Sequence, residues 1–407
     1  MDVQSKTKCF LDGTHRIRTP EDTLERMIPH MRAMGITRIA DVTGLDEIGI
    51  PVVMVCRPNS RSVSVSQGKG STLDAAKASG LMESIESFHA ESITLPLRIA
   101  STHDMNSSSY PTIVEQLPVV RHSPFHKHHP ISWIESIDLV SGKPYWLPYE
   151  LVHTNYTYPR PTGSGCFSAS SNGLASGNSI VEATVHAICE VIERDALTLW
   201  TQMGASAQDR TSIDLDTVDN IACRTTLDKL VAAKQDTYVW NITSDTGVPS
   251  YFAVIRDQYS QSSHIGVGAG THLSHEVALL RALHEAVQVR TTYIVGARDD
   301  IYSEEYTPEG KLAKQKAFGR YINDCSFTTA FPASSGLASD SMESDLQTLL
   351  TCLKQVGIFK VLQVDLSKPE YKVPVVRVVI PGLEAPHDED GYLPGDRAER
   401  FRQAAGE

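Results

Sequence analysis

Residues 171–200, SNGLASGNSIVEATVHAICEVIERDALTLW, decide how the fold is interpreted, because a clear helical pattern begins here. At about 100° per residue, the apolar side chains from Val185 to Leu199 fall on one side of a helix. The acids Glu182, Glu190 and Glu193 fall within an arc of about 80° on the other side. A solvated face is the ordinary explanation of such an acidic stripe. The same stripe also suits a bound cation, so the rest of the chain has to separate the two interpretations.

Two further stretches repeat this pattern: KASGLMESIESFHAE, residues 77–91, and EVALLRALHEAVQVR, residues 276–290. On each, three polar side chains gather on one side of an otherwise apolar helix. They are Ser79, Glu83 and Glu86 in the first stretch and Arg281, Glu285 and Gln288 in the second. If the stripes converge, their like charges repel one another and require cations.

The residue types in these stripes point to a metal-bound polyphosphate. Carboxylates without Cys or ordered His suit Mg²⁺, which keeps water and phosphate oxygens among its ligands. Arg194 and Arg281 supply planar guanidinium groups, which bind phosphate through paired hydrogen bonds.

The composition is that of an ordinary globular protein and excludes several classes. The 407 residues are 41% apolar and 21% charged, and the formal net charge is −12. Nucleic-acid and anionic-membrane binders need clustered Lys and Arg, so we expect no nucleic acid and no membrane as partner. No apolar run reaches the roughly 20 residues that span a bilayer, and no signal peptide is evident, which predicts a cytoplasmic protein. The seven Cys form no CxxC pair, and we expect mostly buried thiols.

Helix-like and strand-like segments alternate along the chain, which predicts a large α/β fold. The expected helices cover 20–35, 71–91, the later part of 171–200, 217–234, 275–296 and 341–355. The expected strands cover 36–43, 50–58, 236–242, 250–257, 360–366 and 374–380, with a β-hairpin around Ser141-Gly142-Lys143.

Four stretches, in order along the chain, resemble the YcaO family. They are GTHRIRTPEDTLERM (13–27), QGKGSTLDAAKASGLMESIESFHAE (67–91), SNGLASGNSIVEATVHAICEVIERDA (171–196) and RALHEAVQVR (281–290). The NxxxE, ExxER and RxxxE spacings are specific in combination, and the chain looks most like the subgroup encoded beside TfuA proteins. The resemblance implies a mixed α/β fold in which ATP and Mg²⁺ bind between helices of separate subdomains, without a P-loop.

The resemblance also implies how the chain is divided. The expected parts are 1–100 with the first Glu-bearing helix, 101–160 as a connecting lobe with the hairpin, 161–385 as the main nucleotide-binding part, and 386–407 as a C-terminal tail.

Roles for individual residues follow from the resemblance. It implies the metal ligands Glu83, Glu86, Glu190, Glu193 and Glu285. It implies further nucleotide contacts from Arg16, Thr23, Ser79, Asn178, Glu182, Arg194 and Arg281, with Arg194 and Arg281 on phosphates. Within this set we expect Glu193, Arg194 and Glu285 to act in the reaction. Arg16 and Thr23 stand where the family has Lys and Ser, and Ala175 stands where some members have a contacting Ser.

The activity that the resemblance implies is ATP-dependent activation of a peptide backbone carbonyl. The chain ends in PGDRAERFRQAAGE, without the Pro-rich tail of many azoline-forming members, and so we favour a peptide thioamide, made with a sulfur donor and a TfuA-like partner. The alternatives are azoline formation from Cys, Ser or Thr of a precursor peptide, and a scaffold that binds nucleotide and peptide without catalysis. A homodimer is expected from the resemblance alone.

Several other features are given ordinary structural interpretations. GVGAGT, residues 266–271, is expected to be a tight turn rather than a dinucleotide loop, because its spacing is GxGxG. QGKGST, residues 67–72, is expected to be a Gly-rich turn before a capped helix, with a phosphate contact as the alternative. The His-rich segment 122–129 is expected to be an exposed loop. Cys166 lacks a base at a recognisable spacing, and His186 is expected to be a hydrogen-bonded core histidine.

Overall fold

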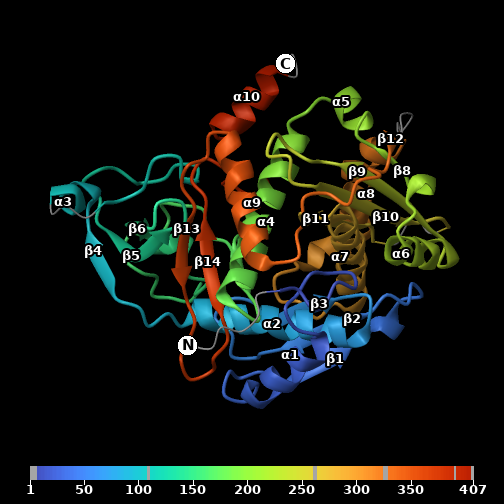
Figure 1. The fold of residues 1–407 in the computed structure, drawn as a ribbon, viewed down its shortest axis with the longest axis horizontal. Helices are drawn as coiled ribbons and strands as arrows, with labels where there is room; N and C mark the ends of the chain where they lie inside the picture. The colour runs from blue at the N-terminus through green and yellow to red at the C-terminus, as the bar shows by residue number, and fades with distance from the viewer. Residues whose placement is uncertain (1–6, 108–110, 260–263, 324–328, 389–390, 405–407) are drawn as a thin grey trace. The chain divides into compact units, whose positions relative to one another are not determined.

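The computed structural model describes residues 7–107, 111–259, 264–323, 329–388 and 391–404, and it confirms a mixed α/β fold (Figure 1). The chain divides into two compact units. Unit 1 comprises Met1–Asn59, Val63–Ser84 and Met203–Ser341, and unit 2 comprises Ser60–Ser62, Ile85–Gln202 and Met342–Glu407. Each unit therefore combines segments that are distant in sequence.

Unit 1 contains a short N-terminal helix and a three-stranded antiparallel sheet. Helix α1 spans Pro20–Met27, and the side chain of Thr19 accepts the N–H of Asp22 to cap it. The helix ends earlier than predicted because Pro29 has no N–H to continue the hydrogen bonding, and a 3-10 turn follows. The strands, in the sheet order β1-β2-β3, are Arg38–Asp41, Val52–Cys56 and Val65–Lys69, and the 3-10 turns are η1 (Ile28–His30) and η2 (Thr43–Leu45).

Helix α2, Leu73–Glu91, packs against strand β3 at very short range, and its residues from Ile85 onward belong to unit 2. A Cβ added to Gly68 would lie 2.0 Å from the carbonyl oxygen of Ala76, so only glycine permits this contact. The Thr72 hydroxyl accepts the N–H of Ala75 and caps the helix. The predicted helix is confirmed, but the preceding QGKGST is the end of a strand followed by a cap, and not a turn.

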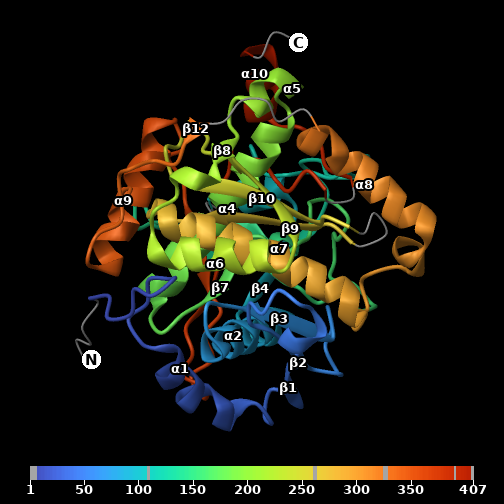
Figure 2. The ribbon, with the colours of Figure 1, turned by 90° about the vertical axis from the view of Figure 1, so that its right-hand side faces the viewer.

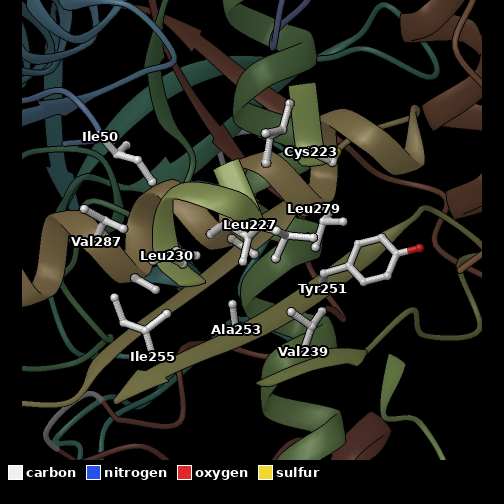
Figure 3. Close-up of a cluster of buried hydrophobic side chains, with 14 of the residues drawn as sticks. Ile50, Cys223, Leu227, Leu230, Val239, Tyr251, Ala253, Ile255, Leu279 and Val287 are labelled. Atoms are coloured by element: carbon white, nitrogen blue, oxygen red, sulfur yellow. The ribbon is translucent and has the colours of Figure 1, made fainter. Parts of the chain in front are cut away.

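The second sheet of unit 1 is antiparallel, with the order β11-β10-β9, and two helices pack against it (Figure 2). Its strands β9, β10 and β11 are Gln235–Asn241, Ser250–Asp257 and Gly266–Thr271, and its helices α6 and α7 are Ile221–Ala232 and His275–Val295. Between sheet and helices lies an apolar cluster that includes Leu227, Val239, Tyr251, Ile255 and Leu279 (Figure 3). Burial of this cluster fixes α7, on which Arg281 and Glu285 lie.

The prediction that GVGAGT forms a tight turn is wrong, because these residues are strand β11. A Cβ on Gly266, Gly268 or Gly270 would come within 2.4 Å of backbone atoms of α7. The alternate glycines therefore face the helix and let the two backbones approach closely.

The remaining elements of unit 1 are short apart from α8. They are α5 (Ala205–Asp209), β8 (Ile213–Asp214), η4 (Leu215–Thr217), η5 (Ser303–Tyr306), α8 (Pro308–Asn323) and β12 (Thr329–Ala330). Strands β8 and β12 pair in parallel.

Unit 2 is built on a six-stranded sheet with the order β4-β5-β13-β14-β7, in which β6 also pairs with β5. The strands are β4 (Leu97–Ala100), β5 (Ile131–Asp138), β6 (Pro144–Pro148), β7 (Leu174–Ser176), β13 (Leu362–Asp365) and β14 (Val375–Val379). Strands β5 and β6 confirm the predicted hairpin. The sequence did not predict β7, which has only three residues and follows a Gly/Ser-rich segment.

Helix α4, Ile180–Thr201, packs on β7 and β14 and on helix α9, Met342–Gln355. Ser179 caps α4 by accepting the N–H of Glu182 at 3.1 Å. The other helical elements are α3 (Thr102–Ser107), η3 (Tyr149–Leu151) and α10 (Asp396–Ala404). No helix of the described chain combines the length and apolar character that crossing a membrane requires.

Candidate functional site

Two of the acids singled out in the sequence lie in one polar cluster of unit 1. The Nζ of Lys69, at the end of β3, donates to Oε2 of Glu285 on α7 at 2.8 Å. Oε1 of Glu83 on α2 accepts the backbone N–H of Gln67 at 3.2 Å. Both carboxylates therefore accept hydrogen bonds from β3, one from Gln67 and one from Lys69.

Two cations and one like charge act on Glu83 in this cluster. Burial is the largest effect on Glu83 and raises its pKa. Arg298 and Lys69 oppose that rise, whereas the like charge of Glu285 adds to it. A bound cation would relieve both the desolvation and the repulsion, so the donor set fits a metal ion.

Arg281 lies one turn before Glu285 on α7, and its side chain is oriented by the main chain of β11. One of its guanidinium nitrogens donates to the carbonyl oxygen of Thr271 at 3.2 Å. Beyond the acids, Gln288 donates to Oε1 of Gln67 at 3.1 Å, which ties α7 to β3. Ser79 is exposed on α2.

The N-terminal candidates Arg16 and Thr23 both lie in unit 1. Arg16 donates to the carbonyl oxygen of His15 at 3.2 Å, and its backbone pairs with that of Phe10. Thr23 is 6% exposed, and its hydroxyl donates to the carbonyl oxygen of Thr19 at 3.0 Å within α1.

In unit 2, Glu86 is held by strand β7. Its Oε1 accepts both the backbone N–H of Ser176 at 2.7 Å and the hydroxyl of the same residue at 2.6 Å. The short strand that the sequence did not predict therefore fixes one of the predicted ligands.

The beginning of α4 brings Asn178 and Glu182 together. Oε1 of Glu182 accepts the backbone N–H and the side-chain amide of Asn178, each at 3.1 Å. Glu182 is only 2% exposed, so its carboxylate does not belong to a solvated helix face.

Further along α4, Glu193 is 6% exposed and lies 4.0 Å from a guanidinium nitrogen of Arg194. Glu190 is half-buried. The next residue after Arg194, Asp195, is fully buried, and both of its oxygens accept hydrogen bonds from Arg397 on α10 at 2.9 Å.

The family model described as a YcaO cyclodehydratase that binds ATP and Mg²⁺ matches residues 67–384, which hold most of these side chains. The chain belongs to the YcaO family. It is accordingly an ATP- and Mg²⁺-dependent enzyme of peptide-backbone modification.

Among its relatives is an uncharacterized protein encoded in the 3′ region of tfuA in Rhizobium leguminosarum bv. trifolii. That protein is 32% identical over 394 residues, which are 94% of this chain and 92% of the relative. The likeness to this relative thus extends over nearly the whole chain.

Solved structures show that the fold is the YcaO fold. The YcaO protein of Methanopyrus kandleri, bound with AMPPCP and Mg²⁺, superposes with a TM-score of 0.76 at 20% identity, over 97% of this chain and all of that one. A heterocyclase in complex with substrate and cofactor gives a TM-score of 0.75 at 22% identity, over 95% of this chain. The chain spans 54% of that heterocyclase.

Within each unit, this YcaO structure joins some of the implied site residues. In unit 1, Glu83 and Glu285 both contact residues of β3. In unit 2, Asn178 contacts Glu182, and Glu193 lies beside Arg194. In the parts of the chain that the structure describes, no three His, Cys, Asp or Glu side chains form a ready-made metal site. The ligand roles of these residues stay predictions.

Sequence reasoning missed the cations of this YcaO cluster. Lys69 was noted only as part of a Gly-rich segment, and Arg298 was not noted at all, although both act on Glu83. The signal for Lys69 was its position between Gly68 and Gly70, which marks a backbone packed closely on another element.

Other features of the YcaO chain play no part in the acidic cluster. Burial raises the pKa of Cys166 to about 11, which keeps the thiol protonated and argues against a nucleophile. Four of the six described cysteines are buried. A cavity of about 630 Å³ in unit 1 is lined by residues that directly precede α2, α6 and α7, including Thr72, Asn220 and Ser274, and by none of the implied site residues.

Proposed function

We propose that this YcaO enzyme converts a backbone amide of a peptide or protein into a thioamide. The observation that carries an ATP-dependent reaction here is the pair Glu83 and Glu285, with Lys69 and Arg298 acting on it. The relative encoded next to tfuA supports the thioamide product and a TfuA-like partner for sulfur delivery.

In the proposed reaction, a sulfur nucleophile adds to the carbonyl carbon of the amide. The resulting oxyanion attacks the γ-phosphorus of ATP, ADP leaves, and the former carbonyl oxygen then departs with phosphate as the C=S bond forms. The chain supplies position and charge neutralisation, which are the main sources of rate in phosphoryl transfer.

The proposed roles follow from side-chain chemistry. Mg²⁺, when bound, neutralises the oxygens of the transferred phosphoryl group. Its ligands would come from Glu83, Glu86, Glu190, Glu193 and Glu285. Arg194 and Arg281 would bind phosphate oxygens through their guanidinium groups. Asn178, Glu182, Ser79, Arg16 and Thr23 would complete the contacts to the nucleotide.

The first test is calorimetric titration of ATP, with and without Mg²⁺, into the wild type and into Glu193→Gln. Loss of one carboxylate charge should weaken Mg-dependent binding and lower turnover by roughly 100-fold or more, because an interaction made in the transition state is removed. Val231→Met, at an exposed position on α6, serves as a control. Equal binding and turnover in all three proteins would contradict the proposed site, and unchanged peptide binding without any turnover in the wild type would favour the scaffold.

The product is identified by comparing the proteome of the natural host with that of a strain in which this gene is deleted. A peptide that carries sulfur in place of a backbone oxygen only when the gene is present supports thioamidation. Deletion of the neighbouring tfuA homologue, where the host has one, should abolish the same modification.

Azoline formation is the second candidate, because the matching family model is described as a cyclodehydratase. In that reaction a Cys, Ser or Thr side chain replaces external sulfur as the nucleophile, and the peptide loses water. The same comparison of peptide masses separates the two outcomes, since ring closure lowers the mass and sulfur exchange raises it.

A further inference from the structure

Lys69 is a partly buried cation at the end of a strand, and it is not among the nucleotide contacts that the resemblance implies. It is the last residue of β3, and its Nζ donates to Oε2 of Glu285 at 2.8 Å. The side chains of Lys69 and Glu285 are 24% and 22% exposed, so the pair is partly shielded from water and remains accessible to it.

Glycines on either side of Lys69 determine where its side chain points. A Cβ on Gly68 would lie 2.0 Å from the carbonyl oxygen of Ala76, and one on Gly70 would lie 2.7 Å from the Cβ of Ala75. Both glycines therefore face α2. Successive side chains of a strand point to opposite faces, so Lys69 faces away from α2 and toward α7.

The neighbouring residue on the same face confirms this orientation. Gln67 contacts Thr292 and Gln288, both on α7, through side-chain hydrogen bonds of 2.6 and 3.1 Å. Strand β3 thus packs against both helices, and its backbone orients the Lys69 ammonium toward the acidic cluster.

The ammonium compensates part of the negative charge of the cluster. Glu83 and Glu285 are like charges that act on each other, and Lys69 acts on both of them. A lysine ammonium is a compact cation with three donors on a flexible stem, and it can move between a carboxylate and a phosphate without losing its charge.

We propose that Lys69 is a built-in counter-ion of this site, which pairs with Glu285 in the nucleotide-free protein and transfers to the terminal phosphate of a nucleoside triphosphate when that ligand arrives with Mg²⁺. The inference rests on the proposed function. It gives Lys69 two effects of opposite sign, because the lysine competes with the metal for Glu285 and attracts the nucleotide.

The test compares the wild type with Lys69→Met, Lys69→Arg and Lys77→Met by titration calorimetry. Lys77 is a matched control, because it also pairs with an acid of unit 1, Asp74, at 3.3 Å, away from the cluster. Each protein is titrated with MgCl₂ alone and with ATP in excess Mg²⁺.

Lys69→Met should bind Mg²⁺ alone roughly fivefold more tightly, and MgATP roughly fivefold or more weakly, the range of a partly exposed charge interaction. Lys69→Arg keeps the charge and should bind Mg²⁺ alone as the wild type does. Lys77→Met should match the wild type in both titrations.

The inference is overturned if Lys69→Met shows wild-type affinity in both titrations, or if it loses affinity for Mg²⁺ and MgATP alike, as a merely structural residue would. If either result is obtained and the wild type binds MgATP, only the role of Lys69 is contradicted. If the wild type binds no MgATP, the proposed function is contradicted as well.

Discussion

His153 is a buried histidine of unit 2, 4% exposed, whose Nδ1 accepts the backbone N–H of Asn155 at 3.1 Å. Burial, followed by the charges of Arg377 and Arg160, lowers the pKa of His153 to about 4. An unfolded histidine titrates near 6.5, so between about pH 6.5 and 4 this histidine is protonated in the unfolded chain and neutral in the folded chain. Its contribution to stability is therefore complete above about pH 6.5 and is lost as the pH falls toward 4.

We predict that His153→Asn flattens this decline, since the amide oxygen can replace Nδ1 as acceptor and does not titrate. Between pH 7.5 and 5 the wild type should lose about 2 kcal/mol more unfolding free energy than the variant. Urea denaturation at the two pH values measures the difference. His126→Asn, at an exposed position, is the control, and a wild-type pH dependence in His153→Asn would contradict the prediction.

Individual residues also show what the sequence could and could not reveal about the site. The acidic stripes were visible because helical spacing alone places Glu83 near Glu86 and Glu190 near Glu193. The partners of these acids were not visible, because Lys69 and Arg298 reach Glu83 from other segments of unit 1. The burial of Glu182 and Glu193 likewise depends on tertiary packing, and it excludes a solvated face for these two acids.

At the scale of elements, the close packing of β11 on α7 rests on glycine. A Cβ on Gly268 would lie 2.4 Å from both the carbonyl oxygen of Ala282 and the backbone nitrogen of Ala286. Helix backbone cannot yield as a side chain can, so the strand or the helix must shift.

We predict that Gly268→Ala lowers the unfolding free energy by about 1–3 kcal/mol, the range for an overpacked core. Because α7 carries Arg281 and Glu285, MgATP binding should weaken as well. Gly44→Ala is the matched control, since a Cβ there meets no atom within 4 Å, and it should change stability by about 0.5 kcal/mol or less. Denaturant unfolding of both variants checks this, and equal stability would show that the interface adapts.

Elements with strong periodicity or alternation were predicted well from sequence, and glycine-rich or very short ones were not. The predicted α4, α7, β9 and β10 are present because apolar spacing and burial agree in them. Strand β11 was missed because glycine normally signals a turn, whereas here its lack of a side chain serves packing. Strand β7 has three residues, too few for a pattern.

On the scale of the whole chain, one buried ion pair fastens α10 to α4 within unit 2. Asp195 and Arg397 are 0% and 3% exposed, and they form two hydrogen bonds of 2.9 Å. Oδ1 of Asp195 also accepts the N–H of Glu384 at 2.8 Å, so the segment leading to α10 is held as well.

We predict that Arg397→Met destabilises the protein by about 3–5 kcal/mol, because it leaves a buried carboxylate without its partner. Arg400→Met, at an exposed position on the same helix, should have little effect. Thermal or urea unfolding measures both, and a loss of stability no larger in Arg397→Met than in Arg400→Met would show that the pair does not hold the helix.

The four ranges into which the sequence was divided remain predictions.

The pairing of β13 with β5 has a consequence for synthesis on the ribosome. Strand β5 ends at Asp138, whereas its partner β13 begins at Leu362. At translation rates of roughly 5–20 residues per second, the backbone edge of β5 stays unpaired for many seconds before β13 is synthesised. An uncovered strand edge is a template for pairing with other chains. Nascent chains of this protein should therefore depend on holding chaperones until β13 emerges.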